Sequence, residues 1–167
     1  AALPDGSTVV AVEDGVPPTL RKFRPDGSRD LDFGVGGVVQ LPFSTAWVDI
    51  DPDGQIVVGA SAPGISISLR RYTPAGVPDI WFVGDPELRQ QHRPVAYDAT
   101  SLVIAHETNT SGRACLSRLD RTEGRLVASF GTGGSVCVDL GATVIDVVAT
   151  AQTDSTYVLA AFASNSR

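Results

Sequence analysis

The segment Leu3-Pro-Asp-Gly-Ser-Thr-Val-Val-Ala-Val12 returns in altered form as Asp51-Pro-Asp-Gly-Gln-Ile-Val-Val-Gly-Ala60. Alignment of Asp5 with Asp53 gives an offset of 48 residues. Each copy has a Pro-Asp-Gly turn, followed by a run of β-favouring residues that leads to a small residue. Such a nearly continuous apolar run predicts a strand that is covered on both faces. Degraded copies of this strand follow later in the chain, at Ser101–Ala105 and Thr156–Ala160.

Two further patterns repeat along the chain. The strand Leu20-Arg-Lys-Phe23 returns as Leu69-Arg-Arg-Tyr72 at an offset of 49 residues. The turn Phe33-Gly-Val-Gly-Gly37 returns as Phe130-Gly-Thr-Gly-Gly134. Between these two turns, Trp81-Phe82 keeps the aromatic residue but loses most of the glycines. The repeat unit is therefore about 48 residues long.

A unit of this length, with several strands and a glycine turn, predicts an all-β fold of the β-propeller class with four-stranded blades. We expect repeats over residues 3–50, 51–97 and 98–150, with a partial repeat over 151–167, in a single propeller region 1–167. The 167 residues correspond to about 3.5 blades, whereas propellers usually close with four to eight. We therefore expect further blades of the same protein, a second chain or a second copy in a homodimer to complete the propeller.

Two segments, Phe23–Val38 and Ser117–Gly134, resemble the bacterial delta-60 repeat. That family pairs an opening Pro-Asp-Gly strand with an Asp-Gly-Ser-x-Asp-x-x-Phe-Gly-x-Gly-Gly turn. The resemblance implies a β-propeller of the kind found in large secreted or surface proteins, and it assigns no catalytic residues. The second repeat departs from the pattern, because Gly84–Pro94 replaces the Gly-x-Gly-Gly turn.

Charge and hydropathy exclude some partners. A net charge of −6 and a pI near 4.7 oppose binding to nucleic acid or anionic lipid, which clustered Lys and Arg normally mediate. The longest wholly apolar run, Val158–Ala163, has six residues and is far shorter than the ~20 that a membrane-spanning helix needs. We expect no nucleic-acid partner and no direct membrane insertion.

An acidic segment raises the possibility of calcium binding. Asp49, Asp51 and Asp53, followed by Gly54, match the first ligands and the glycine of a calcium loop. The bidentate Glu that should close such a loop is replaced by Ala60. The alternative is that these carboxylates cap an ordinary turn of the repeat, and we expect no other cofactor.

Few residues suit catalysis. The chain has two histidines and no Gly-x-Ser-x-Gly motif. His106 takes the place of small or aliphatic residues in the other copies, which favours a packing or surface role. His92 lies in the irregular part of the second repeat, which we predict to be a binding loop because loops on rigid scaffolds often carry function. The residues of that loop are Arg89, Gln90, Gln91, His92 and Arg93.

The two cysteines, Cys115 and Cys137, are placed symmetrically about residue 126. If their strands pair as a hairpin around that residue, the cysteines lie opposite each other and can form a disulfide. The alternative is two buried free thiols. A disulfide would favour an extracytoplasmic protein, secreted, periplasmic or on the cell surface.

Together these patterns predict a non-catalytic extracytoplasmic propeller module that binds a protein or a glycan. One alternative is a structural accessory subunit that completes a larger extracellular or membrane-associated assembly. Another is a fragment of an enzyme whose active groups lie in further blades. Fold alone does not choose among these functions.

Overall fold

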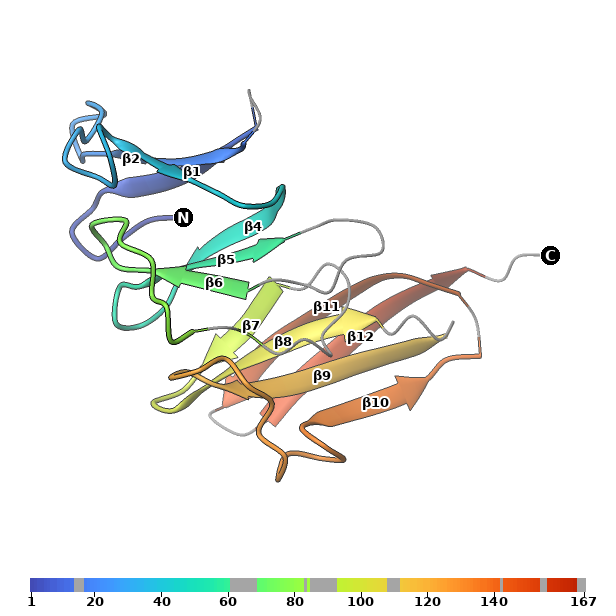
Figure 1. Ribbon diagram of the computed structural model, residues 1–167. Helices are drawn as coiled ribbons and strands as arrows, with labels where there is room; N and C mark the ends of the chain where they lie inside the picture. Colours follow the sequence, from blue (N-terminus) through green and yellow to red (C-terminus); the bar gives the residue numbers. More distant parts are fainter. Residues whose placement is uncertain are drawn as a thin grey trace. The chain divides into compact units, whose positions relative to one another are not determined.

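The computed structural model describes residues 1–13, 17–60, 69–82, 84, 93–107, 112–141, 143–153 and 156–164. In these ranges the regular structure is entirely β, with twelve strands in four antiparallel sheets and no helix (Figure 1). The prediction of an all-β fold is confirmed. In the same part of the chain, no helix could span a membrane.

The chain divides into two compact units. Unit 1 comprises Ala1–Gly64 and Ser68–Val83, and unit 2 comprises Ile65–Ile67 and Gly84–Arg167. Unit 1 holds two sheets of three strands each, and in both sheets strands that follow one another along the chain are paired. The strands are β1 (Thr8–Val12), β2 (Thr19–Phe23), β3 (Val38–Gln40), β4 (Thr45–Ile50), β5 (Ile56–Ala60) and β6 (Leu69–Tyr72).

The core of unit 1 is built from one face of β1 and from β5. Val9, Ile56 and Val58 are fully buried and belong to one apolar cluster. Val57 is also buried, at 1% exposure, so β5 is covered on both faces as predicted. In β1 that prediction is wrong: Val10 is 40% exposed, because it points away from the face that Val9 places in the core.

The small residue at the end of the repeated strand has a specific packing role in β5. Gly59 lies directly opposite Trp47 of β4 in the strand register. A Cβ atom at Gly59 would collide with the indole ring of Trp47, which is itself buried. In this copy, the small residue makes room for an aromatic side chain on the neighbouring strand.

Unit 2 contains a four-stranded sheet in the order β10-β9-β8-β7 and a two-stranded sheet, β11-β12. Its apolar cluster includes Val103, Ala105 and Leu116, with Phe130 packed against it. Strand β11 contacts β7, β8 and β9. The strands are β7 (Arg93–Tyr97), β8 (Ser101–Glu107), β9 (Arg113–Asp120), β10 (Ser135–Asp139), β11 (Thr143–Thr153) and β12 (Thr156–Ser164).

The sheets do not begin where the predicted repeats begin. The Pro-Asp-Gly turn at 52–54 lies inside a sheet, between β4 and β5, which pair with each other. A sheet therefore takes strands from both sides of the predicted repeat boundary at residue 51. The start of a sequence repeat and the first strand of a sheet need not coincide.

Candidate binding surface

Three turns, which follow β2, β6 and β9, share one backbone hydrogen bond and a phenylalanine, although the turn after β9 is one residue longer than the other two. In each of them, an amide of the turn donates to a carbonyl of the preceding strand. A phenylalanine follows three residues later, at Phe33, Phe82 and Phe130. The hydrogen bonds run from Asp30 to Lys22 (2.9 Å), from Asp79 to Arg71 (2.8 Å) and from Val127 to Arg118 (2.8 Å).

In the turn after β6, a cation joins the strand to the turn. Arg71 donates from Nε (2.9 Å) and Nη2 (2.6 Å) to Oδ2 of Asp79. Its guanidinium also lies 4.7 Å from the ring centre of Phe82, which is only 1% exposed. Partial burial raises the pKa of Asp79, but the Arg71 and Trp81 hydrogen bonds outweigh it, so the pKa lies below its ordinary value. The turn is therefore held firmly.

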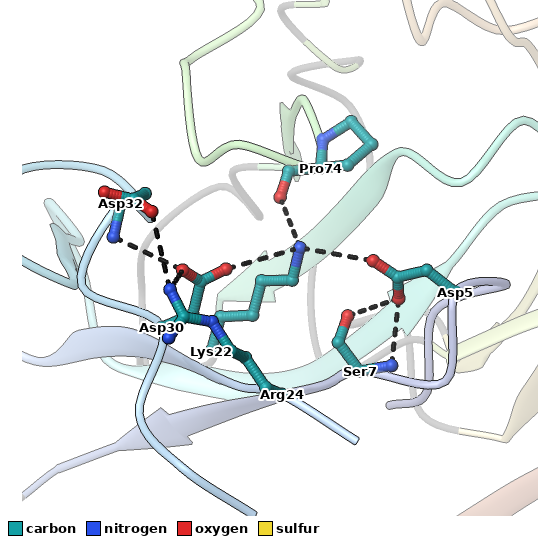
Figure 2. A network of polar contacts seen from close by, with 7 residues as sticks. All are labelled: Asp5, Ser7, Lys22, Arg24, Asp30, Asp32 and Pro74. Carbon is teal, nitrogen blue, oxygen red and sulfur yellow. Dashed lines mark hydrogen bonds and ion pairs between the residues drawn. The ribbon is translucent and has the colours of Figure 1, made fainter. Parts of the chain in front are cut away.

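In the turn after β2, Lys22, the only lysine of the chain, takes the same position (Figure 2). Its Nζ lies 3.5 Å from Asp5, 3.7 Å from Asp30 and 3.4 Å from the carbonyl oxygen of Pro74. Arg24 adds a contact of 3.1 Å to Asp30. Pro74 belongs to the turn after β6, so this network links the two turns.

The two turns also contact each other through their backbones. The amide of Gly34 donates to the carbonyl of Ala75 at 2.8 Å. Gly76 has a φ of +82°, and a Cβ atom there would collide with Val39 and press against Phe33. Glycine is required at this close approach, and the turns after β2 and β6 form one continuous support.

Large apolar side chains project from this support into solvent. The most exposed are Val35 (88%), Ile80 (75%) and Trp81 (75%), and Leu31 (61%) and Val77 (57%) lie on the same two turns. We call these five residues the turn surface. Single exposed apolar side chains are common and need no explanation, but five of them on two hydrogen-bonded turns are typical of a binding site.

Comparison of the three turns shows that packing does not require a tryptophan at position 81. The residue before the phenylalanine is Asp32 in the first turn, Trp81 in the second and Ser129 in the third. All three are exposed, and the Asp32 side chain is 93% exposed. A polar residue therefore satisfies the fold at this position.

Sequence reasoning missed this surface because it treated Trp81-Phe82 as one retained aromatic element. The structure separates the two: Phe82 is buried like Phe33, and Trp81 is exposed. The predicted binding-loop residues Arg89, Gln90, Gln91 and His92 lie outside the described residues. Arg93 begins β7, where its backbone pairs with Ala105.

The acidic segment Asp49, Asp51 and Asp53 forms a capped turn. Asp51 is 4% exposed, and its Oδ1 accepts hydrogen bonds from the amides of Asp53 and Gln55, both at 2.9 Å. The Asp49 carboxylate accepts the amide of Ile50 at 2.9 Å. Throughout the described ranges, no group of three His, Cys, Asp or Glu side chains is placed to hold a metal ion. The hydrogen bonds to Asp51 are those of a turn cap, and calcium binding at this segment stays a prediction.

Unit 2 contains a buried serine–histidine chain. His106 Nε2 lies 2.6 Å from Ser117 Oγ, which lies 2.6 Å from Ser135 Oγ. His106 is 8% exposed and Ser117 is fully buried. A nucleophile and a base within hydrogen-bond reach are the first requirement for covalent catalysis, but here neither faces solvent.

The same sheet carries the two cysteines. Cys115 of β9 and Cys137 of β10 are directly opposite in the strand register, as the symmetry about residue 126 predicts. They form a disulfide, with Cα atoms 4.1 Å apart. The bond ties β10, the outer strand of its sheet, to β9.

Comparison with known proteins assigns neither a family nor a function to this chain. No protein-family model matches the chain, no curated protein matches it, and no solved structure matches it. The resemblance to delta-60 repeats stays a prediction, and the function has to be argued from the geometry above.

Proposed function

We propose that this chain is part of an extracytoplasmic β-propeller that is not an enzyme and that binds another protein or a glycan. Three features support the propeller. The sequence period is about 48 residues, the sheets join consecutive strands, and the sheet β7–β10 has the four antiparallel strands of a blade. The disulfide supports a location outside the reducing cytoplasm.

The observation that carries the binding role is the exposure of Trp81. Its position accepts aspartate or serine in the other two turns, so the tryptophan has another purpose than packing. Tryptophan is enriched among residues that dominate binding energy, and each such residue contributes about 2 kcal/mol or more. Ile80 and Val77 beside it enlarge the area that a partner would bury.

The turn surface is also pre-organised. The Trp81 amide donates to Oδ1 of Asp79 at 3.0 Å, and Asp79 is fixed by Arg71. A partner would therefore lose little free energy to ordering this backbone on binding. The exposed aliphatic side chains favour a protein partner, whereas an exposed indole also suits the apolar face of a sugar ring.

The test is to replace Trp81 with serine, which stands at the equivalent position, Ser129, in the turn after β9. Trp81→Ser should weaken binding about 30-fold, the equivalent of a 2 kcal/mol contact. The matched control is Ser129→Ala at the equivalent position in the other unit, which should change nothing. Affinity would be measured by calorimetry against partners found by native crosslinking and by a glycan array. Equal affinity of the wild type and Trp81→Ser for every partner would contradict the proposal.

The second candidate is a structural accessory subunit, which the open edges of the sheets favour. Within the described residues, β10 pairs with one strand only. A strand with an unpaired edge can accept another strand. Size-exclusion chromatography with light scattering separates the cases: a defined oligomer or stoichiometric complex supports completion by a partner, and a stable compact monomer of 17.4 kDa contradicts an incomplete propeller.

A further inference from the structure

The disulfide lies in an unusual row of side chains. His106 of β8, Cys115 of β9 and Cys137 of β10 are direct neighbours across three adjacent strands. Cross-strand neighbours have Cβ atoms about 4.5–5.5 Å apart, and they point to the same face of the sheet. An imidazole therefore lies beside the sulfur of Cys115.

The two cysteines differ in their exposure to solvent. Cys115 is fully buried. Cys137 is partly exposed and lies on the outer strand of the sheet. On the opposite face of β10, Val136 and Val138 are 46% and 50% exposed. Cys137 is therefore the cysteine that a thiolate arriving from solvent would meet first.

We propose that the Cys115–Cys137 disulfide is a thiol-exchange site at which an external low-molecular-weight thiol attacks Cys137 and Cys115 leaves. The thiolate sulfur bonds to Sγ of Cys137, the Cys115–Cys137 bond breaks, and its electron pair passes to Sγ of Cys115, which then takes up a proton. A second thiol attacks the adduct on Cys137, so two thiols are oxidised to one disulfide while the protein disulfide is reduced to two thiols.

His106 is assigned the role of a positioning residue that favours departure of Cys115. A leaving sulfur departs faster when its thiolate is stabilised, and a neighbouring imidazole provides such stabilisation. The hydrogen bond between His106 Nε2 and Ser117 Oγ holds the ring on the face of the sheet that also carries the disulfide.

Exchange at this site would loosen one strand. In the described part of the chain, β10 is paired only with β9, through the register Ser135–Asp139. Without the covalent link, this pairing and the Ser117–Ser135 hydrogen bond would hold the strand alone. Backbone amides of β10 should then exchange with deuterium on the order of 10-fold faster or more, since a crosslink of this kind restricts opening.

The principal test treats the folded wild-type chain with reduced glutathione, traps the products with iodoacetamide and locates the adduct by mass spectrometry. The expected result is cleavage without unfolding, with glutathione on Cys137. Two results would overturn the proposal: an adduct on Cys115, or cleavage only at urea concentrations that unfold the chain. Either outcome leaves the proposed binding function untouched.

Two pairs of variants sharpen the test. The variant Cys115→Ser keeps Cys137 as its free thiol, and the variant Cys137→Ser keeps the buried Cys115. The thiol of Cys115→Ser should therefore react with an aromatic disulfide reagent about 10-fold faster or more than the thiol of Cys137→Ser. Equal rates would overturn the assignment of Cys137. His106→Gln should slow cleavage by glutathione several-fold, with its urea midpoint measured alongside, and the control Val138→Ala, an exposed residue on the opposite face of β10, should not. An unchanged cleavage rate in His106→Gln would overturn the role of His106.

Discussion

The turns after β6 and β9 share the backbone hydrogen bond that joins each turn to its strand, but they differ by one residue in length and are stabilised differently. In the first, Arg71 pairs with Asp79 and covers the ring of Phe82, which is 1% exposed. In the second, Val127 replaces the aspartate, and Arg118 lies 5.0 Å from the ring of Phe130, which is only partly buried. The backbone conformation thus tolerates different side-chain support. What the turn presents to solvent can vary independently of how it is held.

The largest effect is expected at the buried ring. Phe82→Ala should reduce the free energy of unfolding by about 3–5 kcal/mol, because it removes a fully buried aromatic side chain and leaves a cavity. Phe130→Ala should reduce the free energy of unfolding by about half as much, because the Phe130 side chain is already partly exposed to water. Urea denaturation of both variants measures the difference. Equal costs would mean that the two turns depend equally on their rings.

Asp98 of unit 2 should make the fold sensitive to acid. Partial burial raises the pKa of Asp98, but hydrogen bonds from Ser101 and Thr100 outweigh it and lower the pKa from 3.8 to about 2. A lowered folded-state pKa stabilises the fold above pH 3.8, and this contribution, about 2 kcal/mol, is lost as the pH falls towards 2.

Asp98→Asn checks this contribution. The variant should be less stable than the wild type at neutral pH, and its stability should depend less on pH between about 5 and 2. Urea midpoints measured at several pH values give both slopes. Identical slopes for the two proteins would contradict the role of Asp98.

The Lys22 network should contribute less than the buried ring. Lys22→Met should cost about 1–2 kcal/mol, because it leaves Asp30 without its lysine and the Pro74 carbonyl without a donor. The estimate is modest because the Asp5 side chain is 59% exposed. Lys22→Arg, which copies the residue type of the other two turns, should cost less. Urea denaturation measures the free energy of unfolding of both variants. Equal losses in Lys22→Met and Lys22→Arg would contradict a role of the positive charge at this position.

The smallest effect on folding is expected at Trp81. Trp81→Ser should change the free energy of unfolding by less than about 0.5 kcal/mol, because the side chain is 75% exposed. The reverse exchange, Ser129→Trp, should be equally neutral. Thermal and urea unfolding would measure both. A loss above about 1 kcal/mol in Trp81→Ser would show that the indole is needed for packing and would weaken its assignment to binding.

Several features were predictable from the sequence because they depend on local chemistry. The Pro-Asp-Gly turns follow from residues that favour tight turns, and the strands follow from runs of β-branched residues. The opposition of Cys115 and Cys137 follows from the regular spacing of a hairpin. These features need no knowledge of distant residues.

Other features were missed because burial depends on distant contacts. The sequence places Trp81 and Phe82 next to each other in one turn, but it does not say which of the two rings enters the core. In β1, likewise, the sequence does not say that Val9 is buried and Val10 is exposed. His106 was assigned to a packing or surface role, and its bond to Ser117 depends on the register of β8 against β9.

The sequence by itself determined that this protein is all β, that its turns recur, and that its cysteines can pair, because turn preferences and a two-residue side-chain period act over a few residues. Tertiary structure alone decided where the sheets begin, which aromatic residue is buried, and which cysteine meets solvent. Exposure is a property of how strands pack on one another. That packing leaves Trp81 and Cys137 accessible and covers their neighbours Phe82 and Cys115.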